Sequence, residues 1–460
     1  MKYRIEQDSM GEVKVPEDAY YGAQTQRARD NFSVSTLRFP PCFIKAVALI
    51  KKHAAQVNSE LRLLDAGLSK SIVTAAQEVI EGKFDDQFVV DVFQTGSGTS
   101  TNMNVNEVIA GRANEILNGK RGGKSPVHPN DHVNLGQSSN DVIPSAIHIA
   151  ALLEIRDQLL PALEGLHEEL KEKSEAFREI RKIGRTHLQD AVPITLGQEF
   201  SGYARQSELA IERLRGVAER LSELALGGTA VGNGLNTHPE FASRVIASIS
   251  RETGLALREA KNHFEAQAAQ DAVVETSGVL KAIAVSFVKI ANDIRWLASG
   301  PRCGIGEIII PSLQPGSSIM PGKVNPVIPE MVLQVSAQVI GNDAAITQGG
   351  LTGNFELNVM LPLMAYNLIQ SIQLLAGAAR ALCEKCIRGI EANTEKCASN
   401  LEKSLALATA FVPAVGYDKA ASLAKEAYEK NKTIREVAVE KGVLPEQEIQ
   451  KILNKLVGKD

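Results

Sequence analysis

Residues 273–285 read Val-Val-Glu-Thr-Ser-Gly-Val-Leu-Lys-Ala-Ile-Ala-Val, and this stretch decides the fold class. It is apolar or small on most sides of a helix, and it lies in a helical run from about Phe264 to Ser299 that ends before Gly300-Pro301. At a rise of roughly 1.5 Å per residue, about 36 residues form a helix ~50 Å long. A helix that is apolar nearly all round is buried, so we expect it in a bundle that packs against further copies of the chain.

Four further stretches repeat apolar residues at three- and four-residue steps, which is the period of an α-helix. They run from about Ala151 to Ile183, from Gln198 to Leu226, from Pro329 to Ala344 and from Leu361 to Ile390. Five long helices predict a mainly α protein with a central five-helix bundle. We expect little sheet, with at most short hairpins near the N-terminus and in the C-terminal tail.

Composition divides the chain into three regions. Residues 1–136 hold short apolar runs interrupted by Pro and Gly, which predicts an N-terminal mixed domain. Residues 137–392 hold the long helical runs and predict a central helical-bundle domain, while residues 393–460 predict a small C-terminal helical domain. Three domains agree with a length of 460 residues at roughly 150 residues per domain.

The charge of the chain is nearly balanced, with 50 basic against 54 acidic residues, so we expect neither nucleic acid nor a membrane as partner. The N-terminus lacks the apolar stretch of a signal peptide, so we expect a cytoplasmic protein that acts on a small molecule. The five cysteines are too few and too scattered for a disulfide framework. Cys383 and Cys386 have Cys-x-x-Cys spacing but no second pair, so we expect no metal and no cofactor.

Residues 316–326, Gly-Ser-Ser-Ile-Met-Pro-Gly-Lys-Val-Asn-Pro, carry the most chemistry in the chain. Two glycines and two prolines exclude regular helix or strand here. Lys323 offers a positive charge, Asn325 offers an amide, and backbone N–H groups beside the glycines can form a nest for an oxygen anion. A phosphate loop needs Ser or Thr after Gly-Lys, whereas Val follows Lys323, so a carboxylate fits better than a phosphate. A surface turn that happens to hold a lysine is the alternative.

Two other stretches share this polar composition. Residues 94–104 combine glycines with hydroxyl and amide side chains ahead of a helix-like run, which suits the binding of an anion or a water. Residues 128–141 end in Ser138, Ser139 and Asn140 at what looks like a helix start. Capping of a helix end is the alternative for both stretches.

Residues 184–190 place His187 beside a hydroxyl residue, an arginine and a helix break. An imidazole in such a position can transfer a proton or orient a water. Glu330 could hold His187 in one tautomer if the fold brings the two together. Neutral donors, one lysine, one histidine and several serines fit proton abstraction next to a carboxylate.

Together these motifs resemble the fumarase/aspartase superfamily, and within it the class II, iron-independent fumarases. The segment GSSIMPGKVNP (316–326) matches the superfamily signature. Five further segments resemble class II fumarases: TGSGTSTNMNVNEV (95–108), HPNDHVN (128–134), SSND (138–141), GRTHLQD (184–190) and GNFELNV (353–359). The likeness extends over nearly the whole chain through MGEVKVP (10–16), YGAQTQRA (21–28) and GYDKAA (416–421).

The resemblance implies fumarate hydratase activity, which is the reversible addition of water to fumarate to give (S)-malate through an aci-carboxylate intermediate. It implies dicarboxylate substrates. It also implies that the five-helix bundle assembles into a twenty-helix core in a homotetramer, and that each active site collects motifs from three subunits.

The resemblance further implies the roles of individual residues. Ser317 is the base that removes the C3 proton of malate, and His187, paired with Glu330, handles the leaving water. The substrate-binding residues that it implies are Ser97, Thr99, Ser138, Ser139, Asn140, Thr186, Lys323 and Asn325. His128, Asn130 and Asp131 resemble a second dicarboxylate site near the main one, for which a capped turn is the alternative.

Two other functions remain open from the sequence. Aspartate ammonia-lyase shares the loop 316–326. Aspartases, however, tend to have Ser-Thr-Asn where this chain has Ser138-Ser139-Asn140, and they tend to have Gly-Gln where it has Gly353-Asn354. A homologue that has lost activity, like the lens crystallins related to argininosuccinate lyase, is disfavoured by the presence of Ser317, His187 and Lys323.

Overall fold

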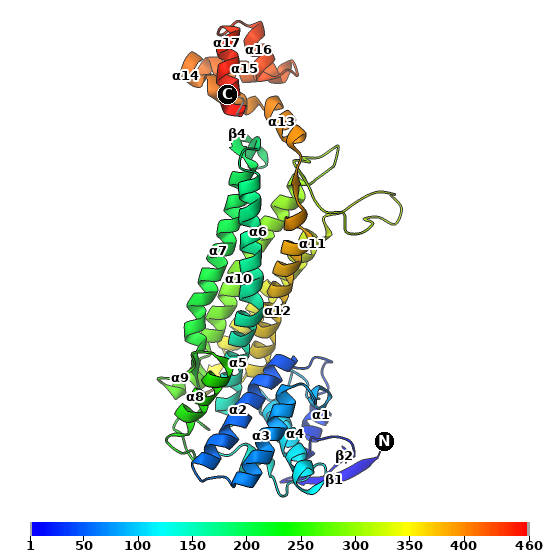
Figure 1. The fold of residues 1–460 in the computed structure, drawn as a ribbon, viewed down its shortest axis with the longest axis vertical. Helices are drawn as coiled ribbons and strands as arrows, with labels where there is room; N and C mark the ends of the chain where they lie inside the picture. Colours follow the sequence, from blue (N-terminus) through cyan, green and yellow to red (C-terminus); the bar gives the residue numbers. More distant parts are fainter. Residues whose placement is uncertain (1, 458–460) are drawn as a thin grey trace. The chain divides into compact units, whose positions relative to one another are not determined.

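Helices make up most of the chain. The computed structural model describes residues 2–457, and Figure 1 shows them as helices joined by loops and a few short strands. The predicted fold class, mainly α, is confirmed. None of the described helices is long and apolar enough to cross a membrane.

The chain folds into two units, each made of three segments. The first unit contains Met1–Pro161, Glu212–Ala282 and Ala337–Ala376, and the second contains Ala162–Ile211, Ile283–Ser336 and Gly377–Asp460. The division into three domains at residues 136 and 392 stays a prediction.

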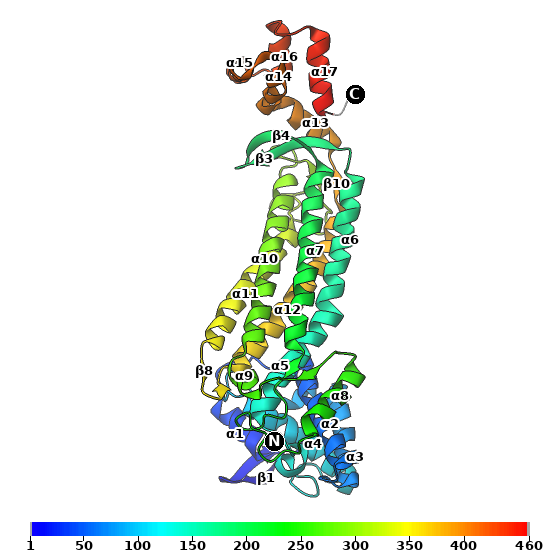
Figure 2. The same cartoon turned by 90° about the vertical axis from the view of Figure 1, so that its left-hand side faces the viewer.

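The five long helices predicted from apolar periodicity are present. They are α6 (Leu160–Ala176), α7 (Leu196–Leu221), α10 (Asp271–Leu297), α11 (Val327–Gly350) and α12 (Leu361–Lys385). Within the second unit, Figures 1 and 2 both show the parts of these helices alongside one another. Apolar side chains fill the space between them, and Phe200 on α7, Phe287 on α10 and Leu382 on α12 are all buried.

The helical run predicted from Phe264 to Ser299 is two helices. Gln270 has a positive φ of 61° and separates the short α9 (His263–Ala268) from α10. The spacing of apolar residues carries no sign of one residue with a left-handed backbone, so the sequence predicted one helix that was too long.

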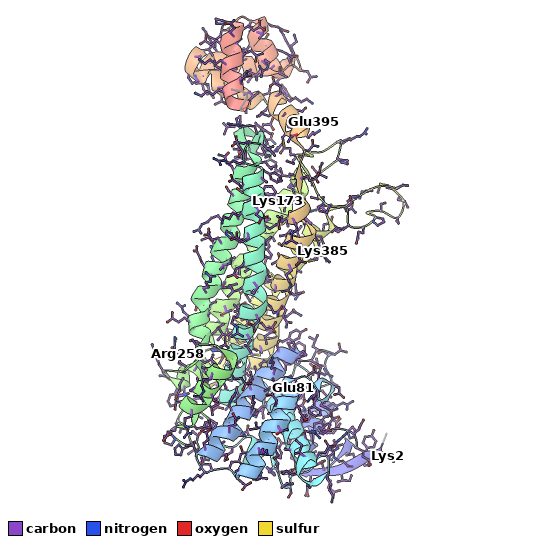
Figure 3. The ribbon with its side chains drawn as sticks, viewed as in Figure 1. Lys2, Glu81, Lys173, Arg258, Lys385 and Glu395 are labelled. Carbon is purple, nitrogen blue, oxygen red and sulfur yellow. The ribbon has the colours of Figure 1, made fainter. Side chains whose placement is uncertain are left out.

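The helical run predicted from Ala151 begins earlier and ends earlier than expected. It starts in α5 (Ser139–Glu154), passes through the π-helical turn η3 (Ile155–Leu159) and continues as α6. It ends at Ala176, so the predicted end at Ile183 was wrong. Lys173 of α6 donates a hydrogen bond of 3.0 Å to the carbonyl of Ile390, just beyond α12; Figure 3 labels Lys173, and Lys385 at the end of α12.

The first unit begins with an antiparallel hairpin of β1 (Tyr3–Asp8) and β2 (Gly11–Pro16), as expected near the N-terminus. Its other elements are α1 (Ala23–Asn31), α2 (Pro41–Glu60), α3 (Ala66–Ile80), η1 (Asp85–Gln87), α4 (Thr99–Asn118), η2 (Pro129–Val133) and α8 (Phe241–Thr253). Helix α2 is central, because it packs against α3, α5 and α8 and buries Phe43, Val47 and Ile50.

Two-residue strands join loops in both units. The pairs are β5 (Glu223–Leu224) with β6 (Arg258–Glu259), β8 (Gly353–Asn354) with β9 (Leu357–Asn358), and β7 (Ile308–Ile309) with β10 (Glu391–Ala392). The last pair ties the segment ahead of the loop 316–326 to the segment that follows α12.

The longest hairpin of the second unit lies where the sequence predicted only a break between helices. Strand β3 (Arg181–Thr186) pairs antiparallel with β4 (Gln189–Thr195). The expectation of hairpins only near the ends of the chain was therefore wrong. Most side chains of the hairpin are exposed or half-buried, so its sequence lacks the apolar alternation by which a half-buried strand is recognised.

The C-terminal region is helical, as predicted. Its elements are η4 (Ile387–Gly389), α13 (Thr394–Lys403), η5 (Leu405–Phe411), α14 (Val412–Val415), α15 (Tyr417–Glu429), α16 (Ile434–Glu440) and α17 (Glu446–Val457). Their core includes Ile183 from β3 together with Phe411 and Val437. The hairpin, which lies next to α13 in Figure 2, is therefore fixed at its base by the apolar core of the C-terminal helices.

Candidate active site

Hydroxyl side chains from two distant segments meet in the first unit. Gly98 has a φ of 73° and directly precedes the first residue of α4, Thr99. A Cβ added at Gly98 would also crowd the side chain of Ile143. The Ser97 and Thr99 hydroxyl oxygens are 2.7 Å apart, and Thr99 Oγ1 is 2.6 Å from Ser139 Oγ at the start of α5. The structure thus brings these three predicted substrate-binding residues together.

Ser138 and Asn140 flank Ser139 and are partly occupied by local structure. Ser138 is the N-cap of α5, and its hydroxyl oxygen accepts a hydrogen bond from Asn140 N over 3.2 Å. The Asn140 side chain donates to the carbonyl of Ala230 over 2.8 Å. The capping role weighed from the sequence is therefore real for Ser138, while Ser139 has no capping contact.

Asp141 fixes the start of α5 through hydrogen bonds to backbone N–H groups. Its carboxylate accepts hydrogen bonds from the backbone N–H of Ser138 at 2.9 Å, of Gly227 at 3.1 Å and of Thr229 at 2.9 Å, and it is fully buried. Burial raises the pKa of this carboxyl, against the effect of the three N–H donors. The first turn of α5 is therefore held to the glycine-rich segment that begins at Gly227.

The first turns of α4 and α5 lie beside these hydroxyls, and some of their backbone N–H groups already donate to side chains, Thr101 N to Gln94 Oε1 and Asn140 N to Ser138 Oγ. Helix N-termini attract anions, and neutral hydroxyls can bind either a carboxylate or a water. None of the predicted substrate-binding side chains of the first unit is a cation. This cluster of hydroxyls can therefore orient a carboxylate or a water, and the predicted residues in it offer no positive side chain.

The second predicted site forms a single capped turn. His128 is the N-cap of η2, and its Nδ1 accepts hydrogen bonds from the backbone N–H of Asn130 and Asp131, both at 3.2 Å. Burial lowers the pKa of His128, which favours the neutral ring that these two bonds require. The Asp131 carboxylate is exposed, and the Asn130 side-chain oxygen accepts a weak bond of 3.4 Å from Gln24. His128, Asn130 and Asp131 are thus brought together, with their backbone groups already used for capping.

His187 and Leu188 form the two-residue turn at the tip of the β3–β4 hairpin. Their φ angles are 56° and 59°, as the type I′ hairpin turn requires, although neither residue is the Asn or Gly that this turn prefers. The His187 and Thr186 side chains are both exposed. The turn therefore presents an imidazole and a hydroxyl to solvent on a rigid two-stranded support.

The loop 316–326 folds back on itself. Gly316 N donates to the carbonyl of Lys323 over 2.7 Å, and a Cβ at position 316 would come within 2.6 Å of the same carbonyl oxygen. Within this closed loop the Ser317 hydroxyl oxygen accepts hydrogen bonds from Ile319 N at 3.2 Å and Met320 N at 3.0 Å. Two N–H groups thus donate to one oxygen, that of Ser317, and they come from Ile319 and Met320, whereas the N–H group of Gly316 is used by the Lys323 carbonyl.

Lys323 and Asn325 are joined at the other end of the loop. Lys323 Nζ donates to Asn325 Oδ1 over 2.6 Å, and Asn325 Nδ2 donates to the carbonyl of Gly316 over 2.6 Å. The asparagine thus holds the ammonium group beside the Ser317 nest. Figure 1 shows the segment between α10 and α11 as loops that extend away from the helices.

Glu330 lies in the first turn of α11, directly after the loop. Among residues 2–457, no hydrogen bond or ion pair joins Glu330 to His187, so a single chain does not form the predicted pair. The predicted residues therefore fall into the hydroxyl cluster, the hairpin tip and the loop, which the chain carries as separate groups.

Sequence reasoning missed the ion pair that holds the hairpin. Arg185 Nη1 donates to Glu307 Oε2 over 2.9 Å and Arg185 Nη2 donates to Glu307 Oε1 over 2.8 Å. Lys182 Nζ lies 3.3 Å from the same carboxylate, and both Lys182 and Glu307 are buried. The only signal in the sequence was a glutamate, Glu307, next to the apolar run Ile308–Ile310.

Cys383 and Cys386 form no disulfide bond. Cys383 and Cys386 are both free and buried, and burial raises the pKa of the Cys386 thiol to about 12. In the described part of the chain, no group of three or more His, Cys, Asp or Glu side chains is arranged to hold a metal ion.

Known proteins resemble this chain over nearly its whole length. Residues 11–341 match the lyase family, and residues 407–456 match the fumarase C C-terminal family. The class II fumarate hydratase of Nitrosomonas europaea is 56% identical over 441 residues, which are 96% of this chain and 96% of that protein. This chain belongs to the class II fumarases.

Other relatives agree with this assignment. The enzyme of Halobacterium salinarum is 57% identical over 98% of this chain and 96% of its own length, and mitochondrial fumarate hydratase of Rattus norvegicus is 54% identical over 96% and 87%. The crystal structure of class II fumarase from Schistosoma mansoni has a TM-score of 0.96 at 40% identity, covering 99% of this chain and 98% of that one. A fumarate lyase:delta crystallin from Brucella melitensis bound to cobalt has a TM-score of 0.94 at 48% identity, covering 99% of both chains.

Proposed function

We propose that this class II fumarase interconverts fumarate and (S)-malate through an aci-carboxylate intermediate, with Ser317 as the base. The observation that carries the proposal is the pair of N–H groups, from Ile319 and Met320, that donate to the Ser317 hydroxyl oxygen. A serine hydroxyl is a weak base at neutral pH, so it needs strong stabilisation of its deprotonated oxygen. Preorganised N–H donors supply that stabilisation without reorganisation during the reaction.

In the malate direction the Ser317 oxyanion takes the proton from C3. The electron pair of the broken C–H bond moves onto the neighbouring carboxylate, which gains a second negative charge in the aci-carboxylate. Lys323 balances that charge, and Asn325 orients the ammonium group through a bond of 2.6 Å.

The second step breaks the C2–O bond. His187, paired with Glu330, delivers a proton to the leaving hydroxyl, which departs as water while the C2–C3 double bond forms. Ser97, Thr99 and Asn140 hold this water, and their grouping around the N-termini of α4 and α5 supports that role. Thr186, Ser138 and Ser139 bind the carboxylates of the substrate.

We also propose a homotetramer with a twenty-helix core, in which three subunits contribute to each active site. Two observations support it. His187 and Glu330 are not joined within one chain, and apolar side chains of α10 are exposed in the single chain, with Val285 at 55% and Trp296 at 53%. Apolar surface of this kind marks protein–protein contact. The three-domain division into residues 1–136, 137–392 and 393–460 is part of the same proposal.

His128, Asn130 and Asp131 form a second dicarboxylate site in this proposal, which binds substrate outside the place of reaction. The exposed Asp131 carboxylate repels an anion, and the N–H groups of Asn130 and Asp131 already donate to His128 Nδ1, so the His128 Nε2–H group and the Asn130 side-chain amide provide the binding groups.

One assay tests the proposed function. The purified protein is incubated with malate and, separately, with aspartate, and the ultraviolet absorbance of the fumarate double bond is followed. We expect fumarate from malate only. Absorbance from aspartate alone would replace the proposal with aspartate ammonia-lyase activity.

A further inference from the structure

A fully buried lysine lies behind the candidate residues of the first unit. Lys51 is in the middle of α2 and has no exposed surface. Its Nζ donates hydrogen bonds to Asn134 Oδ1 at 2.9 Å and to Gln137 Oε1 at 3.0 Å. Lysine is almost never fully buried unless its charged end has partners, so these two bonds account for its position.

The protonation state of Lys51 does not decide whether these bonds form. Burial lowers the pKa of Lys51 to about 7, against the attraction of the buried Asp141 carboxylate. Both the ammonium and the neutral amine have N–H groups that can donate to the two amide oxygens. The contact therefore persists across neutral pH.

Asn134 is the junction of the network. Its Oδ1 also accepts hydrogen bonds from Asn102 Nδ2 at 3.2 Å and Asn106 Nδ2 at 3.1 Å, both on α4. Its Nδ2 donates to the carbonyl of Gln137 at 3.0 Å, and its backbone N–H donates to the carbonyl of Pro129 at 3.1 Å. We call Lys51, Asn102, Asn106, Asn134 and Gln137 the Lys51 hub.

The Lys51 hub joins every segment of the first unit that carries a candidate residue. Asn102 is in the first turn of α4, three residues after Thr99. Asn134 directly follows η2, which begins after His128, and Gln137 directly precedes the N-cap of α5 at Ser138. Helix α2, the start of α4 and the loop 134–137 between η2 and α5 thus share one set of hydrogen bonds around the buried Lys51.

Fold stability alone is a poor reason for such a hub. Replacing buried charged groups with apolar side chains of similar volume is often neutral or stabilising, whereas hydrogen bonds shared by several segments fix how those segments are arranged. Among residues 2–457, Asn102 Oδ1 and Asn106 Oδ1 accept no hydrogen bond, so the hub is held by the N–H groups that donate to Asn134 and Gln137. The arrangement fixed here is that of the Thr99 and Ser139 hydroxyls, which lie 2.6 Å apart.

We propose that Lys51 is a positioning residue for dicarboxylate binding, which acts through Asn134 and Gln137 to set the spacing of the α4 and α5 N-termini. The proposal rests on the proposed function, because it assigns the substrate to that cluster.

The test compares Lys51→Met with Lys52→Met in the full-length enzyme. Lys52 is the next residue of α2, and it donates to Gln77 and Glu252 instead of to the hub. We expect Lys51→Met to raise KM for malate roughly tenfold and, because Thr99 also holds the leaving water, to lower kcat, while Lys52→Met keeps both constants. A residue that served stability alone would lower the midpoint of unfolding and leave KM unchanged.

Gln137→Met is the second variant, because a half-buried loop residue is tolerated more readily than a core lysine. It removes one acceptor of Lys51 Nζ, and we expect a rise in KM of a few-fold. If Lys51→Met does not fold by circular dichroism and size exclusion, Gln137→Met decides. A KM within about twofold of the wild type in the folded variant overturns the proposal.

Hydrogen exchange separates this proposal from the proposed function. If the wild type turns over no malate, the proposed function fails, and the hub is judged by exchange of peptides that cover residues 99–106 and 129–141. Faster exchange there in Gln137→Met, with residues 271–297 unchanged, supports the hub. Wild-type exchange in all three regions overturns it.

Discussion

Arg185 and Glu307 are paired through two hydrogen bonds although 122 positions separate them in the sequence. Arg185 directly precedes Thr186 and His187, and Glu307 directly precedes β7, from which the chain leads to the loop 316–326. The buried Glu307 carboxylate therefore joins two segments. One is the strand that leads to the candidate proton donor His187, and the other is the segment that leads to the candidate base Ser317. Burial raises the pKa of the Glu307 carboxyl, but the hydrogen bonds from Arg185 and the charge of Lys182 outweigh it and hold the pKa below its usual range.

Replacing Glu307 with Gln should lower both stability and turnover. The change removes the carboxylate that pairs with Arg185, while Lys182 keeps Glu199, whose Oε2 lies 3.0 Å from its Nζ. Breaking a buried pair costs about 3 kcal/mol or more of the free energy of unfolding. We expect kcat to fall by at least about tenfold as the hairpin loses its anchor. Urea unfolding and malate kinetics measure the two effects. Glu395→Gln, an exposed position labelled in Figure 3, is the control and should match the wild type.

Ser317→Ala should reduce turnover by roughly a thousandfold or more while leaving the assembly intact, because it removes the proposed base and only one small side chain. The matched control is Ser318→Ala, which changes the exposed neighbouring serine of the same loop. Malate kinetics and size exclusion are measured on both. Near-normal turnover of Ser317→Ala would reject the serine as the base.

Mixing two inactive variants tests whether subunits share active sites. Ser317→Ala and His187→Asn are each expected to be inactive, and their 1:1 mixture is unfolded and refolded together. If the two residues of one site come from different subunits, about a quarter of the wild-type activity returns, because random mixing leaves each position intact half of the time. If both residues come from the same subunit, no activity returns, so a flat result contradicts the shared site.

The pH dependence of stability should carry a component from Lys51. Its pKa is lowered from 10.5 in the unfolded chain to about 7 in the folded one. Between these values the unfolded state binds the additional proton, so the free energy of unfolding rises with pH, by up to about 1.4 kcal/mol per pH unit. Lys51→Met should remove this rise between about pH 7 and 10.5, and Lys52→Met should keep it. Urea unfolding of the three proteins across this range measures the difference, and parallel curves for all three would contradict it.

Much of the fold could be predicted because its signals are local. Each long helix repeats apolar residues at the helical period, and the glycines and prolines of residues 316–326 indicate a loop. The single left-handed residue Gln270, which ends α9, has no such pattern. The β3–β4 hairpin was missed for the same reason, because its exposed strands carry few apolar side chains.

The candidate site could be predicted only as separate motifs. The nest around Ser317 and the grouping of Ser138 to Asn140 are formed within a few residues, so composition indicates them. Lys51 and Glu307 owe their roles to partners that lie 83 and 122 positions away. In the sequence Lys51 is followed by a second lysine and Glu307 stands alone before an apolar run, and only the fold distinguishes either from a surface residue.

The turn at the tip of the β3–β4 hairpin has a consequence for the evolution of this protein. Glycine fits the φ of 59° at position 188 without strain, so a selection for thermal stability favours Leu188→Gly, where the side chain is 66% exposed. At His187 the same change would relieve the same strain and delete the imidazole. Under the proposed role of His187, selection for heat resistance and selection for catalytic rate therefore oppose each other at residue 187.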